Sequence, residues 1–166
     1  MALIIVKAVN SVGVVVPNAL VLFRRKFHLK VQERVRIMPE LIILVGLPAS
    51  GKSTLTKKKY STYTRVNLDT LKKHSKEVQI VGAAVSAGKD IIIDNTNTLI
   101  KERKRFLTMV PDTYTKKCIW LKVEKPICIE RNKNRANKVH IVAIHTKAKR
   151  FEEPTIDEGF DSLEIL

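Results

Sequence analysis

The feature that most constrains this 166-residue chain is a glycine-rich segment that directly follows a short apolar run. Residues 41–45 read LIILV, which is typical of a strand buried on both faces of a parallel sheet. Residues 46–53 read GLPASGKS and match the phosphate-loop pattern GxxxxGK[ST] in full. Because this match lies between an apolar strand and a helix-forming segment, the sequence predicts a nucleotide-binding α/β domain rather than a purely structural glycine turn.

Each residue type in this loop has a predicted role. The glycines allow the backbone to turn so that its N–H groups point at the phosphates of a nucleotide. Lys52 is expected to reach the β- and γ-phosphates, and Ser53 to offer its hydroxyl to Mg²⁺, so ATP and Mg²⁺ are the expected cosubstrate and cofactor. The residues predicted to contact the nucleotide here are Gly46, Pro48, Ala49, Ser50, Gly51, Lys52, Ser53 and Thr54.

Two carboxylates follow further strand-like runs. Asp69 comes after the run 64–68, where a carboxylate can accept the proton of an attacking hydroxyl, although it is also a plausible helix cap. Asp94 follows the apolar run 91–93, as in a Walker-B strand, and is expected to hold Mg²⁺ or to orient the acceptor; the alternative is an Asx turn that caps the next helix. The residues predicted to contact the acceptor are Asp69, Lys72, Asp94, Asn95, Thr96 and Asn97.

A pair of arginines follows the fourth apolar run, residues 118–123. Arg131 and Arg135 are four residues apart, so a helix would place both guanidinium groups on one face, where they can clamp phosphates. The alternative is a solvated basic face. Together with Lys52 and Asp69, these arginines complete the predicted catalytic set.

The charge of the chain indicates a polyanionic partner. It has 31 basic and 16 acidic residues and a net charge of +15, which favours nucleic acid. Candidate phosphate contacts are Lys72, Lys73, Lys76 and the basic residues of 101–105, although for any single lysine the sequence favours a solvated surface. The last 16 residues carry six carboxylates and no Lys or Arg, so this tail is expected to pack against the basic body or to close over part of it, in a structural role.

Five blocks together resemble the kinase domain of polynucleotide 5′-hydroxyl kinases, the end-healing enzymes of DNA and RNA repair. They are GLPASGKST at 46–54, VNLDTL at 66–71, IIIDNTN at 91–97, RNKNR at 131–135 and the tail at 151–166. The resemblance covers about residue 41 to the end, and the DNTN and FExPxxxEGF blocks are similar to the branch fused to a 3′-phosphatase in animal repair enzymes.

The resemblance implies ATP-dependent transfer of the γ-phosphate to the 5′-OH end of DNA or RNA. It makes Asp69 the general base and Arg131 and Arg135 the lid arginines. Two positions depart from the family pattern, because Leu68 stands where Arg is usual and Val142 where Pro is usual. Two other functions stay open: a small-molecule kinase with a compact acceptor pocket, and a non-catalytic nucleic-acid-binding module with a vestigial phosphate loop.

The expected fold is a three-layer α/β P-loop NTPase fold with a mostly parallel sheet of four or five strands and an arginine-bearing lid. We expect residues 38–166 to form a P-loop polynucleotide kinase domain and residues 1–37 to be a poorly ordered extension. A DxDGT phosphatase motif is absent from the 166 residues, so a stand-alone kinase module is expected.

The expected environment follows from two further features. Polar residues interrupt the apolar segment 1–22, so no stable membrane insertion is expected. Two cysteines cannot build a disulfide framework, which favours a reducing intracellular compartment, nuclear or cytoplasmic, with a mitochondrial location as the alternative.

Overall fold

The computed structural model describes residues 38–166 of the chain. The chain divides into two units, Met1–Ile37 and Met38–Leu166, and only the second is described. The predicted extension 1–37 lies outside the described residues, so the proposed division into an extension and a kinase domain stays a prediction. No helix in the described part is long and apolar enough to cross a membrane.

Five parallel strands form one sheet in the order β2-β3-β1-β4-β5. The strands are β1 (Glu40–Val45), β2 (Thr64–Val66), β3 (Ile91–Ile93), β4 (Thr115–Trp120) and β5 (Ser162–Ile165). The predicted mostly parallel sheet of four or five strands is therefore confirmed. Strand β1, the first within residues 38–166, is the central one, and its residues 41–45 are buried as predicted.

The fourth strand begins three residues earlier than predicted. It was expected at 118–123, but β4 pairs with the whole of β1 and ends at Trp120, opposite Val45. Its first half contains charged residues that find partners: Lys116 Nζ lies 2.7 Å from Asp112 Oδ1, and Lys117 Nζ lies 2.9 Å from Glu164 Oε2. The strand forms where the sequence looks too polar because residues 115–117 pair in register with 40–42 of β1.

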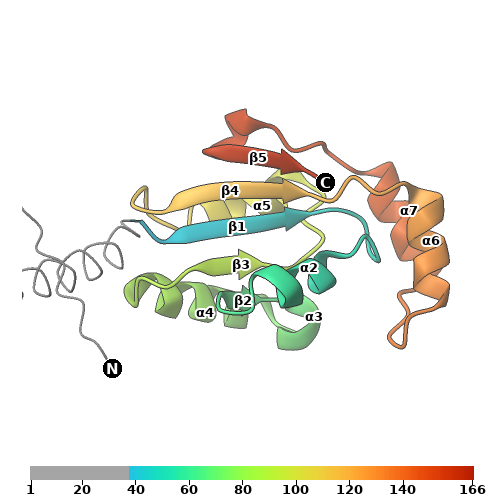
Figure 1. Cartoon of the computed structure of the whole chain (residues 1–166), viewed down its shortest axis with the longest axis horizontal. Coiled ribbons are helices and arrows are strands. Elements are labelled where there is room, and N and C mark those ends of the chain that lie inside the picture. The colour runs from blue at the N-terminus through green and yellow to red at the C-terminus, as the bar shows by residue number, and fades with distance from the viewer. Residues whose placement is uncertain (1–37) are drawn as a thin grey trace, which may run out of the picture. The chain divides into compact units, whose positions relative to one another are not determined.

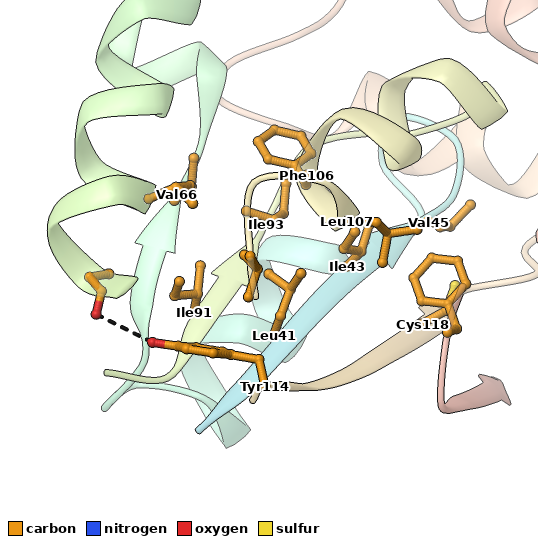
Figure 2. Close-up of a cluster of buried hydrophobic side chains, with 14 of the residues drawn as sticks. Leu41, Ile43, Val45, Val66, Ile91, Ile93, Phe106, Leu107, Tyr114 and Cys118 are labelled. Atoms are coloured by element: carbon orange, nitrogen blue, oxygen red, sulfur yellow. Dashed lines mark hydrogen bonds between the residues drawn. The ribbon is translucent and has the colours of Figure 1, made fainter. Parts of the chain in front are cut away.

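Helices cover both faces of the sheet. On one face, alternate residues of β1 (Leu41, Ile43 and Val45) pack in a buried cluster with side chains of α4 and α5, such as Val81 and Phe106 (Figure 2). On the other face, the intervening strand residues pack against Leu55 of α2. The helices are α2 (Lys52–Lys59), α3 (Leu68–Leu71), α4 (His74–Ser86), α5 (Ile100–Leu107), α6 (Lys125–Lys133), α7 (Ile141–Lys149) and the 3₁₀ helix η1 (Ile156–Glu158).

The two remaining long helices form a lid at the carboxyl ends of the strands. Figure 1 shows the strand arrowheads pointing toward the end of the domain where α6 and α7 lie. A third apolar cluster of Leu47, Cys128 and Ile144 joins the phosphate loop to both lid helices. The three-layer fold with a lid is therefore as predicted, and the phosphate loop and the lid meet at the sheet edge where parallel α/β folds bind ligands.

The acidic tail packs against the body of the domain. Arg103 of α5 is fully buried, and its Nε and Nη2 each lie 2.6 Å from a carboxylate oxygen of Glu158 in η1. Its Nη1 donates to the backbone oxygens of Asn97 and Glu152, each at 3.0 Å. Arg103 was grouped with the candidate phosphate contacts, and that interpretation is wrong because its guanidinium is used inside the fold.

Candidate active site

The phosphate loop has the backbone conformation that its glycines permit. Gly46 and Gly51 have φ values of +151° and +110°, which residues with side chains rarely adopt. A Cβ on Gly46 would lie 2.8 Å from Ser50 Oγ and 2.9 Å from the backbone oxygen of Leu121. Gly46 therefore allows close packing of the loop against the end of β4, and α2 begins directly after Gly51.

Lys52 is folded into its own loop. Its side chain is 7% exposed, and Nζ donates to the backbone oxygens of Gly46 (2.9 Å) and Leu47 (2.7 Å) and to Ser50 Oγ (3.2 Å). Burial lowers the pKa of Lys52 to about 8, an effect that the nearby negative charge of Asp94 partly offsets. Burial removes water from the Lys52 ammonium group, and a phosphate bound in the loop would compensate for that loss with negative charge. The loop therefore favours an anionic ligand.

The lowered pKa of Lys52 has a measurable consequence for stability. Between about pH 8 and its ordinary value of 10.5, the lysine is neutral in the folded domain but protonated in the unfolded chain. Folding then releases a proton, so this group's contribution to the free energy of unfolding rises with pH across this window and is constant below about pH 8. We expect the nucleotide-free wild type to gain stability relative to Lys52→Met from pH 8 to pH 10, by on the order of 1 kcal/mol or more.

Urea unfolding of both proteins at pH 7, 8, 9 and 10 measures this difference. Other groups that titrate in this range cancel in the comparison, because both proteins contain them. A difference in unfolding free energy that stays constant from pH 7 to pH 10 would contradict the lowered pKa.

Ser53, at the start of α2, contacts Asp94, which follows β3. Ser53 Oγ donates to Asp94 Oδ1 at 3.3 Å, and Asp94 is 2% exposed. Its other oxygen, Oδ2, accepts hydrogen bonds from Nε of Arg65 at 2.8 Å and from Nη2. Arg65 was not predicted, because only the pairing of β2 with β3 brings its side chain to Asp94.

The oxygen atoms of Ser53 and Asp94 suit Mg²⁺ chemically. Mg²⁺ prefers hard oxygen ligands and is usually held by one or two protein groups together with substrate phosphates. Within 38–166 there is no group of three or more His, Cys, Asp or Glu side chains placed to hold a metal by themselves. The pair therefore fits a metal ion that arrives with a nucleotide rather than one held by protein ligands alone.

Asp69 lies in the first turn of the short helix α3. It is exposed and lines the cavity described below. Asn67, not Asp69, caps this helix, because Asn67 Oδ1 accepts the backbone N–H of Thr70 at 3.0 Å. The alternative that Asp69 is a helix cap is therefore wrong, because the cap of α3 is Asn67.

The DNTN segment after β3 is used mainly to hold the site together. Asn97 is 2% exposed and its Nδ2 donates to the backbone oxygen of Leu44 at 2.7 Å, while the backbone oxygen of Thr96 accepts the N–H of Gly46 at 3.0 Å. Asn95 Oδ1 accepts the N–H of Leu68 at 2.8 Å. These bonds tie the segment to β1, to the phosphate loop and to α3, and none of its side chains caps α5.

The two lid arginines do not share one helix. Helix α6 ends at Lys133, so Arg135 lies in the loop that follows, and the predicted common helical face is wrong. Asn132 explains the early end, because its amide donates to the backbone oxygen of Val139 at 2.7 Å and accepts the Val139 N–H at 3.0 Å. Arg131 remains on α6, where Nη1 donates to the backbone oxygen of Ser50 at 3.3 Å.

A cavity of about 1210 Å³ brings most of the predicted residues together. Gly46 and Lys72 are not among its lining residues; Lys72 instead ends α3 in a left-handed conformation. The sequence did not indicate Asn67, His74 or Lys147, which also line it. Two of the candidate phosphate contacts, Lys101 and Arg105, line it, and so do fourteen of the predicted nucleotide, acceptor and catalytic residues: Pro48, Ala49, Ser50, Gly51, Lys52, Ser53, Thr54, Asp69, Asp94, Asn95, Thr96, Asn97, Arg131 and Arg135.

Comparison with known proteins shows what this chain is similar to. A family model described as an AAA domain matches residues 75–154. The chain is 33% identical over 146 residues to a bifunctional polynucleotide phosphatase/kinase of Schizosaccharomyces pombe, covering 83% of this chain and 35% of that protein. It is 27% identical over 138 residues to a putative bifunctional polynucleotide phosphatase/kinase of Acanthamoeba polyphaga mimivirus, covering 76% of this chain and 33% of that protein.

Solved structures agree on the fold. A sugar kinase from Janibacter sp. HTCC2649 superposes with a TM-score of 0.60 at 14% identity, covering 77% of this chain and 84% of that one. The chain spans about a third of the length of the curated relatives that it matches. The resemblance drawn from the five sequence blocks is confirmed, and the chain is a P-loop kinase-fold relative of the bifunctional polynucleotide phosphatase/kinases.

Proposed function

We propose that this chain transfers the γ-phosphoryl group of ATP to the 5′-hydroxyl end of DNA or RNA, as a step in the repair of nucleic acid ends. The observation that carries the proposal is that one cavity is lined both by residues 48–54 of the phosphate loop and its helix start and by an exposed carboxylate, Asp69. Its volume of about 1210 Å³ exceeds the roughly 300–1,000 Å³ of an ordinary small-molecule pocket, so it has room for a nucleotide and an acceptor end.

In this proposal the residues of the chain perform an in-line transfer. Asp69 accepts the proton of the 5′-hydroxyl as its oxygen bonds to the γ-phosphorus, and the bond from that phosphorus to the β,γ-bridging oxygen breaks to release ADP. Lys52 exchanges its bonds to the loop carbonyls for bonds to phosphate. Arg131 and Arg135 neutralise charge that develops on the transferred group.

Ser53 and Asp94 are the residues that would hold Mg²⁺. When bound with a nucleotide, the ion would supply positive charge that stabilises the phosphates. Arg65 fixes one oxygen of Asp94, so that the other oxygen faces Ser53 and the phosphate loop.

Charge and relatedness support a polynucleotide acceptor over a small molecule. The net charge of the chain is +15, and Lys58 and Lys101 line the cavity, as does Lys147, which pairs with Glu102 at 2.8 Å. Basic side chains around an acceptor site attract a phosphate backbone, whereas a neutral sugar gains nothing from them. The names of the two curated relatives point to the same class of acceptor.

The test is an acceptor comparison. The full chain would be incubated with Mg²⁺, γ-labelled ATP and single-stranded DNA or RNA with 5′-OH ends, with 5′-phosphorylated oligonucleotides, a nucleoside and gluconate as parallel acceptors. We expect label in 5′-OH oligonucleotides alone, with a rate that falls as salt rises. Label in the nucleoside or gluconate alone would replace the proposal with a small-molecule kinase, and salt-sensitive binding without transfer would indicate a non-catalytic module.

A further inference from the structure

A polar cluster adjoins the cavity, which three of its members, His74, Asn95 and Arg105, line, and its buried fourth member has no role in the chemistry described so far. At its centre is Glu77 of α4, whose side chain is 0% exposed. Oε1 accepts Asn95 Nδ2 at 2.7 Å, and Oε2 accepts Nη2 of Arg105 and lies 2.7 Å from Nδ1 of His74. Burial of a carboxylate is costly unless every oxygen is paired, and here it is paired by three different segments of the chain.

The partners keep this carboxyl ionised. Burial alone would raise the pKa of Glu77, but hydrogen bonds from His74, Arg105 and Asn95 together lower it below its ordinary value. An ionised carboxylate only accepts hydrogen bonds. The Asn95 amide must therefore turn its NH₂ group toward Glu77, which leaves its oxygen facing the opposite way.

The opposite side of Asn95 is the start of the helix that carries Asp69. Asn95 Oδ1 accepts the N–H of Leu68 at 2.8 Å, and Leu68 is the first residue of α3. This N–H has no partner within the helix, as is usual in a first turn. Helix α3 has only four residues, too few to be stable alone, so its position depends on such anchors.

We propose that Glu77 is a positioning residue for Asp69, acting through Asn95 and the Leu68 N–H, an inference that rests on the proposed function of this site. The cluster fixes the amide of Asn95 in one orientation, and that orientation holds the first turn of α3 at the cavity wall. Glu77 itself touches neither nucleotide nor acceptor.

Glu77→Gln tests this orientation with a nearly isosteric change. A glutamine offers one oxygen and one NH₂, so it cannot accept from both Asn95 and Arg105. If the side-chain amide of Asn95 flips in response, its NH₂ group faces the Leu68 N–H. The hydrogen bond from the Leu68 N–H to Asn95 Oδ1 is then lost. A misplacement of about 1 Å costs on the order of 10²-fold in rate, so we expect kcat for 5′-OH phosphorylation to fall by about 10- to 100-fold while the Kd for ATP changes less than about twofold.

The direct readout is hydrogen exchange at the Leu68 amide, measured by NMR on the full chain without substrates. We expect this amide to exchange about tenfold faster in Glu77→Gln, while the Gly46 amide, which donates to the backbone oxygen of Thr96, is unchanged. Glu164→Gln is the matched control, because Glu164 also pairs with a basic residue, Lys117, but lies on β5 away from the cavity. It should leave both readouts as in the wild type.

Asn95→Ala provides a second route if Glu77→Gln folds poorly, because it breaks the same chain of contacts and leaves the Glu77 carboxylate in place. The double variant should lose no more activity than the stronger single variant. An unchanged Leu68 amide in both single variants, or losses in kcat that add in full, would overturn the inference. A wild type that phosphorylates no 5′-OH end would instead overturn the proposed function, and the exchange rates would still report whether Glu77 orders α3.

Discussion

Asp69→Asn is expected to reduce phosphorylation of 5′-OH ends by about 10²- to 10⁴-fold, the range typical for removal of a general base. Asparagine has nearly the same shape but cannot accept the proton of the attacking hydroxyl. Because Asp69 is exposed and Asn67 supplies the cap of α3, the substitution leaves the helix and the fold intact. The measurement is single-turnover transfer from γ-labelled ATP, with ATP affinity measured separately.

Asp112→Asn is the matched control for this experiment. Asp112 is also an exposed aspartate, but it pairs with Lys116 and does not line the cavity. We expect Asp112→Asn to have wild-type activity and both variants to bind ATP with wild-type affinity. Transfer by Asp69→Asn within about threefold of the wild type would exclude Asp69 as the base.

The phosphate loop and the sheet could be predicted because their determinants are local. An apolar run followed by GxxxxGK[ST] specifies a strand, a turn and a helix start within about fifteen residues, and each step depends on neighbours in sequence. The same reasoning placed Asp69 and Asp94 after β2 and β3, because parallel strands present their carboxyl ends at one edge. All fourteen of the predicted nucleotide, acceptor and catalytic residues that line the cavity follow from such local patterns or from the family resemblance.

The wrong and the missed predictions arose where a contact beyond the local pattern decides the structure. Arg131 and Arg135 have helical spacing, yet the bonds from Asn132 to Val139 close a loop and end α6 first. Glu77 lies at an ordinary position of an amphipathic helix, and only the packing of α4 against α5 and the segment after β3 surrounds it with donors. Spacing along the chain carries no signal for such partners.

Arg103 is the clearest of these cases, and it leads to the largest expected effect on stability. In sequence it belongs to a basic run that looks solvent-exposed, but the tail residue that pairs with it, Glu158, lies 55 positions later. Arg103→Met is expected to lower the free energy of unfolding by about 3–5 kcal/mol, because it leaves the carboxylate of Glu158, 6% exposed, without its partner. Domains commonly have only about 5–15 kcal/mol in total, so the loss is a large fraction of the stability.

Urea unfolding followed by tryptophan fluorescence measures this loss, since Trp120 is buried in the core that the tail covers. Arg150→Met removes an exposed arginine and should change the unfolding free energy by less than about 0.5 kcal/mol. Arg103→Met combined with Glu158→Leu should recover much of the stability, because no buried charge is then left unpaired. If Arg103→Met unfolds at the same urea concentration as the wild type, the ion pair does not hold the tail. If the double variant is no more stable than Arg103→Met, the loss comes instead from the unpaired backbone oxygens of Asn97 and Glu152, or from the Thr155 N–H that Glu158 no longer caps.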